Sequence, residues 1–215
     1  MPLLELRGLD ARYGDTQVLH SVSLTVDDGD FVAILGTSGA GKSTMLRAIS
    51  GTVRSSGEVT FEGERLYRRT PEGMARRGVA HLPQGGGALR ALSVLDNLRL
   101  GAWTQRGTSA RDLVHVFEMF PMLYDRRRDR AGSLSGAEQH LLALGRAMMA
   151  KPRLLLVDEP ASGLEPAVAR SIGSTLHVLN ERGTTIVAVE QTAGLALAAA
   201  KRTIVLDAGH VVRTD

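Results

Sequence analysis

The sequence lacks cysteine altogether, has only three lysines and contains no long apolar run. The absence of cysteine fits a reducing compartment, because disulfides belong mainly to secreted proteins. No apolar stretch approaches the roughly 20 residues that a membrane-spanning helix needs, so any membrane role must come through partners. No apolar secretory segment stands at the N-terminus either. Together these features predict a cytoplasmic protein.

Positive charge is plentiful but is carried almost entirely by arginine. The chain has 26 basic and 23 acidic residues, a net charge of +3, and its lysines are Lys42, Lys151 and Lys201. Four arginines cluster within residues 126–130, and such a cluster can bind nucleic acid or anionic lipid. Acidic residues surround it, however, and no aromatic residues interleave with it. We therefore predict a solvated helix end there and no nucleic-acid partner.

The length and composition allow one good core. Of the 215 residues 43% are hydrophobic, enough to bury a single core with at most a subdomain. Three short β-rich segments separated by Gly/Asp turns predict an antiparallel sheet, at residues 3–7, 18–26 and 57–61. Further strands are predicted at residues 31–35, 79–82, 153–157 and 184–189, followed by a hairpin at residues 204–206 and 210–213.

Helical patterns occupy the middle of the chain. The periodicity becomes helical from Ser93 to about residue 130, with Ser93 and Ser109 as N-caps. Another helix is predicted after Ser135, because Glu138 three residues later completes a capping box. A further helix starts at Pro166. We predict one α/β domain over residues 1–215, in which residues 1–90 and 145–215 form the core with its β subdomain and residues 91–144 an inserted helical subdomain.

One stretch organises the rest of the chain, FVAILGTSGAGKSTMLRAIS at residues 31–50. An apolar strand runs into a glycine-rich turn and then a helix, the order that a phosphate-binding loop requires. The glycines let successive N–H groups point at an anion, Lys42 adds charge for the β- and γ-phosphates, and the helix start adds its partial positive charge. The predicted nucleotide-binding residues of this loop are Gly36, Thr37, Ser38, Gly39, Ala40, Gly41, Lys42, Ser43 and Thr44.

Three further side chains are suited to chemistry beside this loop. The hydroxyl of Ser43 is a suitable ligand for Mg²⁺. Asp158 and Glu159 end an apolar strand, at the edge where ligands bind in open α/β sheets. Asp158 is therefore predicted to hold Mg²⁺, and Glu159 to polarise an attacking water.

With these residues in view, the chain resembles the ATP-binding subunit of ABC transporters over essentially its full length. The resemblance rests on five motifs in the family's order: GTSGAGKST at residues 36–44, Gln84 after an apolar strand, LSGAEQ at 134–139, LLLVDEP at 154–160 and SGLEP at 162–166. It implies a P-loop NTPase (RecA-like) core with an N-terminal antiparallel β subdomain and an inserted helical subdomain. It also implies hydrolysis of ATP with Mg²⁺.

The resemblance assigns roles to individual residues. It implies that Tyr13 stacks on the adenine ring, that Gln84 joins the Mg²⁺ chemistry to a transmembrane contact, and that Glu159 is the catalytic base. It further implies a head-to-tail dimer, in which the signature residues of one subunit reach the γ-phosphate held by Lys42 of the other. Those residues are Ser135, Gly136 and Ala137. The sequence itself supports this dimer, because Ser135 opens an isolated helix N-terminus with small neighbours, an anion site without an anion of its own.

Two stretches are most similar to the smaller ATPase of bacterial branched-chain amino acid importers, which works beside a second ATPase. They are residues 120–149 and VEQTAGLAL at residues 189–197. The similarity implies uptake of branched-chain or other hydrophobic amino acids through transmembrane permease subunits, with a solute-binding protein involved indirectly. It implies a second ABC ATPase subunit, in a homo- or heteromeric dimer on the cytoplasmic face of the bacterial inner membrane. The permease contact is expected near residues 91–101.

Three departures from the family pattern bear on turnover. Gln191 stands where most members carry histidine, and glutamine can hydrogen-bond a γ-phosphate or water but cannot become cationic. Ala137 replaces a glycine of the signature, and the glycines at residues 85–87 replace bulkier residues. The alternatives are a urea or amide importer ATPase, a soluble phosphotransferase and a nucleotide-dependent regulatory module with weak hydrolysis. A dinucleotide-binding loop fits less well, because it requires Gly or Ala where Thr44 stands.

Overall fold

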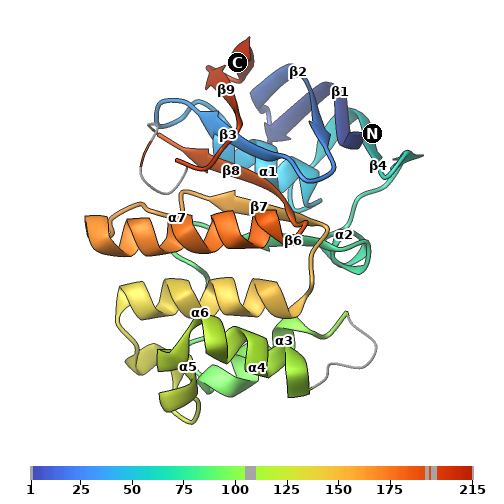
Figure 1. The fold of residues 1–215 in the computed structure, drawn as a ribbon. Coiled ribbons are helices and arrows are strands. Elements are labelled where there is room, and N and C mark those ends of the chain that lie inside the picture. Colours follow the sequence, from blue (N-terminus) through green and yellow to red (C-terminus); the bar gives the residue numbers. More distant parts are fainter. Residues whose placement is uncertain (1, 105–109, 192–193, 195–197, 215) are drawn as a thin grey trace.

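Two β-sheets and a group of helices make up the fold (Figure 1). The computed structural model describes residues 2–104, 110–191, 194 and 198–214. Within these ranges one sheet has four strands in the order β2-β1-β4-β5, and the other has six in the order β10-β9-β3-β8-β7-β6. None of the helices described is both long and apolar enough to cross a membrane.

The four-stranded sheet is the predicted N-terminal antiparallel subdomain. Its strands are β1 (Pro2–Tyr13), β2 (Thr16–Asp27), β4 (Ser55–Phe61) and β5 (Glu64–Arg65). Strand β1 pairs antiparallel with both β2 and β4. The first two strands are longer than predicted because irregularities in their register, such as the one between Leu6 and Leu9, bend them without ending the pairing. As a result β1 reaches Tyr13 at the turn into β2.

The six-stranded sheet is mostly parallel and forms the centre of the molecule. Its strands are β3 (Phe31–Leu35), β6 (Val79–Leu82), β7 (Leu154–Asp158), β8 (Thr185–Glu190), β9 (Arg202–Asp207) and β10 (His210–Thr214). Only β10 pairs antiparallel, with β9, in the predicted hairpin. Because parallel strands share a carboxyl edge, Leu35, Asp158 and Glu190 end their strands at the same edge of the sheet.

The central sheet separates two hydrophobic cores. Alternate residues of a strand point to opposite faces. Val32 and Ile34 therefore join the core shared with the four-stranded sheet and α1 (Lys42–Ile49). Phe31 and Ala33 join the core shared with α7 (Pro166–Glu181) and the helical group. In Figure 1 α7 lies between the central sheet and α6, whereas α1 lies on the side of the antiparallel sheet.

The helical group follows β6 in the chain, as predicted. Its elements are α3 (Val94–Gly101), α4 (Ala110–Met119), α5 (Pro121–Asp125), the 3₁₀ turn η1 (Ala131–Ser133) and α6 (Gly136–Met149); the short α2 (Pro71–Arg76) precedes β6. Ser93 caps α3 by accepting the Asp96 N–H, whereas the other predicted cap, Ser109, lies outside the described residues. The subdomain boundary predicted between residues 144 and 145 falls inside α6.

Candidate functional site

The glycine-rich loop joins the end of β3 to the start of α1, as the sequence predicts. Gly39 and Gly41 have φ angles of 82° and 100°, in the left-handed region that glycine adopts most readily. Gly41 is also the N-cap of α1, and a Cβ added there would lie 2.9 Å from Cδ2 of Leu19. A larger residue at this position would strain the backbone and collide with β2. The loop therefore depends on glycine for a path that can curve around an anion.

Lys42 lies in the first turn of α1 and is almost completely buried. Its Nζ donates to the carbonyl oxygens of Gly36, at 2.8 Å, and Thr37, at 3.0 Å. The same nitrogen lies 3.6 Å from Oε1 of Glu159. The ammonium is thus held inside the curve of the loop by oxygen acceptors, which the oxygens of a phosphate group can replace. This geometry fits the phosphate-binding role predicted for Lys42.

The C-terminal hairpin supports the loop. Gly209 N donates to the carbonyl oxygen of Ala40 at 2.9 Å, and a Cβ on Gly36 would lie only 2.2 Å from the carbonyl oxygen of Leu206. Gly36 and Ala40 therefore meet the hairpin through backbone contacts, whereas the carbonyl oxygen of Thr37 accepts from Ala40 N within the loop. The remaining loop residues line a cleft of about 390 Å³, together with one residue of β2 and with residues just after the ends of β6, β7 and β8. The lining is formed by Val18, Ser38, Gly39, Gly41, Lys42, Ser43, Thr44, Gln84, Glu159 and Gln191.

Ser43 and Asp158 meet at the floor of the loop. The Ser43 hydroxyl donates to Oδ1 of Asp158 at 2.8 Å. Burial raises the pKa of Asp158, and the hydrogen bond from Ser43 opposes this rise. A hydroxyl beside a carboxylate is a hard-oxygen pair of the kind that Mg²⁺ prefers, with its other ligands supplied by phosphate and water. The residues present therefore fit Mg²⁺. In the described part of the chain no group of three or more His, Cys, Asp or Glu could hold a metal ion.

The carboxylate of Glu159 attracts donors from three other parts of the chain. Gln84 Nε2 donates to its Oε2 at 2.8 Å, and Gln191 Nε2 donates to its Oε1 at 3.4 Å, beside Lys42. Glu159 is only 7% exposed and has a φ of 45°, a strained conformation for a residue other than glycine. The other two predicted catalytic residues, Gln84 and Gln191, thus both contact Glu159 at the cleft.

Tyr13 lies outside the lining of this cleft. It ends β1, is 44% exposed, and its hydroxyl accepts a hydrogen bond from Nη1 of Arg47 at 3.3 Å. Because Arg47 belongs to α1, this contact ties the tyrosine to the helix that follows the phosphate-binding loop. The ring remains open to solvent on the same side of the molecule as the loop helix.

The signature residues do not line the cleft around Lys42. Ser135, Gly136 and Ala137 stand at the start of α6, and none of them is among the residues that line it. Ser135 instead completes the predicted capping box: its hydroxyl accepts the N–H of Glu138 at 3.3 Å, and its own N–H donates to Glu138 Oε2 at 2.7 Å. Within one chain, therefore, the two halves of the expected site are separate.

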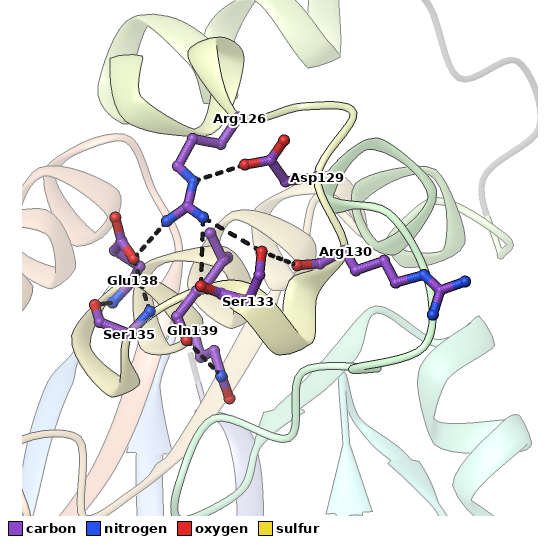
Figure 2. A network of polar contacts seen from close by, with 8 residues as sticks. Arg126, Asp129, Arg130, Ser133, Ser135, Glu138 and Gln139 are labelled. Atoms are coloured by element: carbon purple, nitrogen blue, oxygen red, sulfur yellow. Dashed lines mark hydrogen bonds and ion pairs between the residues drawn. The ribbon is translucent and has the colours of Figure 1, made fainter.

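Arg126 braces the start of α6 (Figure 2). Its guanidinium donates to Glu138 Oε2 and Asp129 Oδ2, both at 2.9 Å, and lies 3.3 Å from the Ser133 carbonyl oxygen and hydroxyl. The backbone N–H of Ser135, followed by the charge of Arg126, holds the pKa of Glu138 below its usual range. The prediction of a solvated helix end is therefore incomplete, because the side chain of Arg126 is bound to other residues. Arg126 does follow α5, but its side chain is engaged because α5 ends against the start of α6.

The sequence did not single out Glu190. This residue ends β8, is 8% exposed, and its Oε1 accepts the N–H of Ala161 at 3.0 Å. Burial raises its pKa, and the hydrogen bond from Ala161 opposes that rise. Its place at the carboxyl end of a buried strand, one residue before Gln191, was the signal available in the sequence. The hydrogen bond to Ala161 spans 29 residues and could not be foreseen from the sequence.

Comparison with known protein families shows the family to which this chain belongs. Residues 19–162 match the ABC transporter family, and this stretch includes the loop, Gln84, the capping box and Glu159. The chain belongs to the ABC transporter family. It is 39% identical over 215 residues to the high-affinity branched-chain amino acid transport ATP-binding protein BraG of Pseudomonas aeruginosa. The alignment covers 99% of this chain and 92% of BraG. It is 37% identical over 225 residues to the phosphonates import ATP-binding protein PhnC of Trichormus variabilis, covering 98% and 91% of the two chains.

The fold of this ABC cassette agrees with those of solved relatives. It superposes on the dimeric bacterial ABC transporter cassette MJ0796 with a TM-score of 0.88 and 26% identity, over 99% of this chain and 97% of that one. The family and fold predicted from the five motifs are confirmed. The chain is a nucleotide-binding ATPase subunit of an ABC transporter, with a P-loop core, an antiparallel β subdomain and an inserted group of helices.

Proposed function

We propose that this ABC cassette hydrolyses Mg-ATP to power the uptake of branched-chain or other hydrophobic amino acids through transmembrane permease subunits. The observation that carries the ATPase part is the convergence of Lys42, Gln84 and Gln191 on Glu159 beside the phosphate-binding loop. The choice of solute is supported by the similarity to BraG, whose name specifies branched-chain amino acid transport.

The chain's own groups divide the work of hydrolysis. Lys42 and the N–H groups of the loop hold the β- and γ-phosphates. Glu159 accepts a proton from the water that attacks the γ-phosphorus in line with the leaving oxygen. Gln191, 3.4 Å from Glu159, orients that water or the γ-phosphate. Because Glu159 is buried, bulk water does not compete for its hydrogen bonds.

Mg²⁺ would be held by Ser43, Asp158 and Gln84 and would neutralise charge on the phosphate oxygens. The Ser43–Asp158 contact of 2.8 Å supports the first two ligands. The Nε2 of Gln84 donates to Glu159, so the Oε1 of Gln84 is the atom suited to a metal. The same side chain therefore contacts both the proposed base and the proposed metal position.

The remaining contacts of the nucleotide come from Tyr13 and from a second cassette. Tyr13 stacks on the adenine, a role supported by its exposure and by the hydrogen bond from Arg47 that ties it to α1. Ser135, Gly136 and Ala137 reach the γ-phosphate of a facing subunit. Their separation from the cleft of their own chain supports this head-to-tail arrangement, because the start of α6 then serves a nucleotide held by the other subunit. The facing subunit is either a second copy or another ABC ATPase.

The permease contact is proposed on a groove beside α3. The groove has a volume of about 260 Å³, and its wall includes His81, Leu100, Trp103, Thr104 and Arg146. Within the described residues His81 Nε2 and Thr104 Oγ1 are buried without a hydrogen-bond partner. A segment of a permease seated here would supply those partners. The cassette would then lie on the cytoplasmic face of the bacterial inner membrane, and a solute-binding protein would act through the permeases.

The first test is ATP hydrolysis by the purified chain, alone and together with the ATPase and permeases encoded beside it. Activity is expected to rise strongly with those neighbours. Glu159→Gln is expected to keep ATP binding, measured with a fluorescent ATP analogue, and to lose at least about 99% of hydrolysis, because amide nitrogen cannot accept the proton. Lys42→Ala is the control that loses binding.

Each contrary outcome has a definite meaning. Retention of most activity by Glu159→Gln would remove Glu159 as the base. Binding of ATP with no hydrolysis in any setting would favour the regulatory module, with Ala137 and Gln191 as its cause. Stimulation by a urea- or amide-binding protein, but not by one for hydrophobic amino acids, would replace the proposed solute.

A further inference from the structure

Glu190 has no part in the hydrolysis steps above, yet its position is unusual for an acidic residue. It is 8% exposed at the end of β8, and its Oε1 accepts the N–H of Ala161 at 3.0 Å. Ala161 lies two residues after Glu159. The bond therefore joins the strand that precedes Gln191 to the turn that carries Glu159.

That turn holds Glu159 in an unfavourable backbone conformation. A φ of 45° at a residue other than glycine persists only where the surroundings fix it. The N–H of Glu159 donates to the carbonyl oxygen of Val189 at 3.0 Å, and the N–H of Ser162 donates to the carbonyl oxygen of Glu159 at 3.2 Å. Glu190 supplies the acceptor for the donor between them, the N–H of Ala161. Two successive residues of β8, Val189 and Glu190, thus accept N–H groups from the turn.

Packing alone does not explain an acid here. Burial raises the pKa of Glu190, which shows that the site is unfavourable for its charge, and an apolar residue would be buried at lower cost. The carboxylates of Glu159 and Glu190 also border one cleft of about 270 Å³, together with Ala161, Ser162 and Gln191. Glu190 is therefore close enough to affect the geometry of the proposed base without touching the phosphate-binding loop.

We propose that Glu190 is a positioning residue, which holds Glu159 in its reactive orientation by accepting the N–H of Ala161. This inference rests on the proposed role of Glu159 as the base. The role requires an acceptor oxygen on a side chain as long as that of glutamate, and it does not require the negative charge. Glutamine keeps that oxygen, whereas aspartate keeps the charge but is one methylene too short.

The test compares Glu190→Gln, Glu190→Asp and Glu190→Ala in the cassette assembled with its permeases and partner ATPase. The Gln variant is expected to keep at least about half of kcat. The Asp and Ala variants are expected to lose kcat by about tenfold or more, with KM for ATP within about twofold of the parent, because the loop that binds ATP is intact.

Asn180→Ala is the matched control. Asn180 is also 8% exposed, and its Nδ2 donates to the carbonyl oxygens of Gly29, Asp30 and Thr184, near the amino ends of β3 and β8. This variant is expected to unfold at a lower temperature while keeping kcat, which separates loss of positioning from loss of stability.

The outcomes distinguish this inference from the function on which it rests. Normal kcat in Glu190→Asp and Glu190→Ala overturns the positioning role. A Gln variant as slow as the Asp variant shows that charge matters and overturns the acceptor mechanism. Normal hydrolysis by Glu159→Gln overturns the base itself. Loss of hydrolysis in Glu159→Gln with full activity in all Glu190 variants overturns only the role of Glu190.

Discussion

At the scale of single residues, the buried polar groups beside the phosphate-binding loop have specific partners. In the cleft Nζ of Lys42 lies 3.6 Å from Oε1 of Glu159, and the Ser43 hydroxyl donates to Asp158. Removing one member of such a pair leaves the other buried and unpaired, which costs more than the pair contributes. The same argument applies to His81 in the groove beside α3. Its Nδ1 lies 3.1 Å from the Ser50 hydroxyl, and burial, helped by the charge of Arg47, lowers the pKa of His81 to about 4.

His81 makes a testable contribution to the pH dependence of stability. The unfolded chain binds a proton at this residue below its ordinary pKa of 6.5, whereas the folded chain does so only near 4. Stability is therefore lost as the pH falls through this interval. We expect the melting temperature of the parent to fall between about pH 7.5 and about pH 5. The melting temperature of His81→Gln is expected to fall by several degrees less. Val114→Gln, an exposed change on α4 that alters no titratable group, is the control with a parental slope. An undiminished slope in His81→Gln would show that His81 is not held neutral.

At the scale of elements, local patterns were predictable and contacts between elements were not. The start of α6 was predicted because Ser135 and Glu138 are three residues apart, so the capping box depends only on helix geometry. The same holds for the strand, loop and helix around Lys42. The brace by Arg126 was not predicted, because it depends on how α5 meets α6. The support of Ala40 by the C-terminal hairpin, more than 160 residues away, escaped prediction for the same reason.

Arg126→Ala tests the brace on α6. The variant is expected to melt at a slightly lower temperature than the parent, because the ion pairs of Arg126 with Glu138 and Asp129 are partly exposed and each contributes little. The stability difference is also expected to shrink at high salt, since screening weakens the pairs in the parent. Arg128→Ala, two residues along and exposed, is the control without an effect. Equal melting temperatures for the two variants would contradict the brace.

At the scale of the whole molecule, the two halves of the proposed nucleotide site lie in different parts of the fold. The loop belongs to the core between the two sheets, whereas Ser135 belongs to the helical group on the other side of α7. The loop and the capping box were each predictable, because their motifs are local in the chain. Their separation depends on tertiary packing, which places α1 and α6 in the two different hydrophobic cores of the central sheet. A site that needs both halves therefore needs two subunits.

Mixing two inactive variants tests this composite site where the chain pairs with itself. Lys42→Ala removes the loop half of a site, and Ser135→Phe blocks the signature half. A mixed dimer then has one intact site, formed by Lys42 of one chain and Ser135 of the other, and one site with both defects. Random pairing makes half of the dimers mixed, so the mixture is expected to recover about a quarter of parental hydrolysis. Sedimentation of Glu159→Gln with Mg-ATP establishes whether self-pairing occurs. Self-pairing without recovery would contradict the composite site, because sites confined to one chain cannot complement each other.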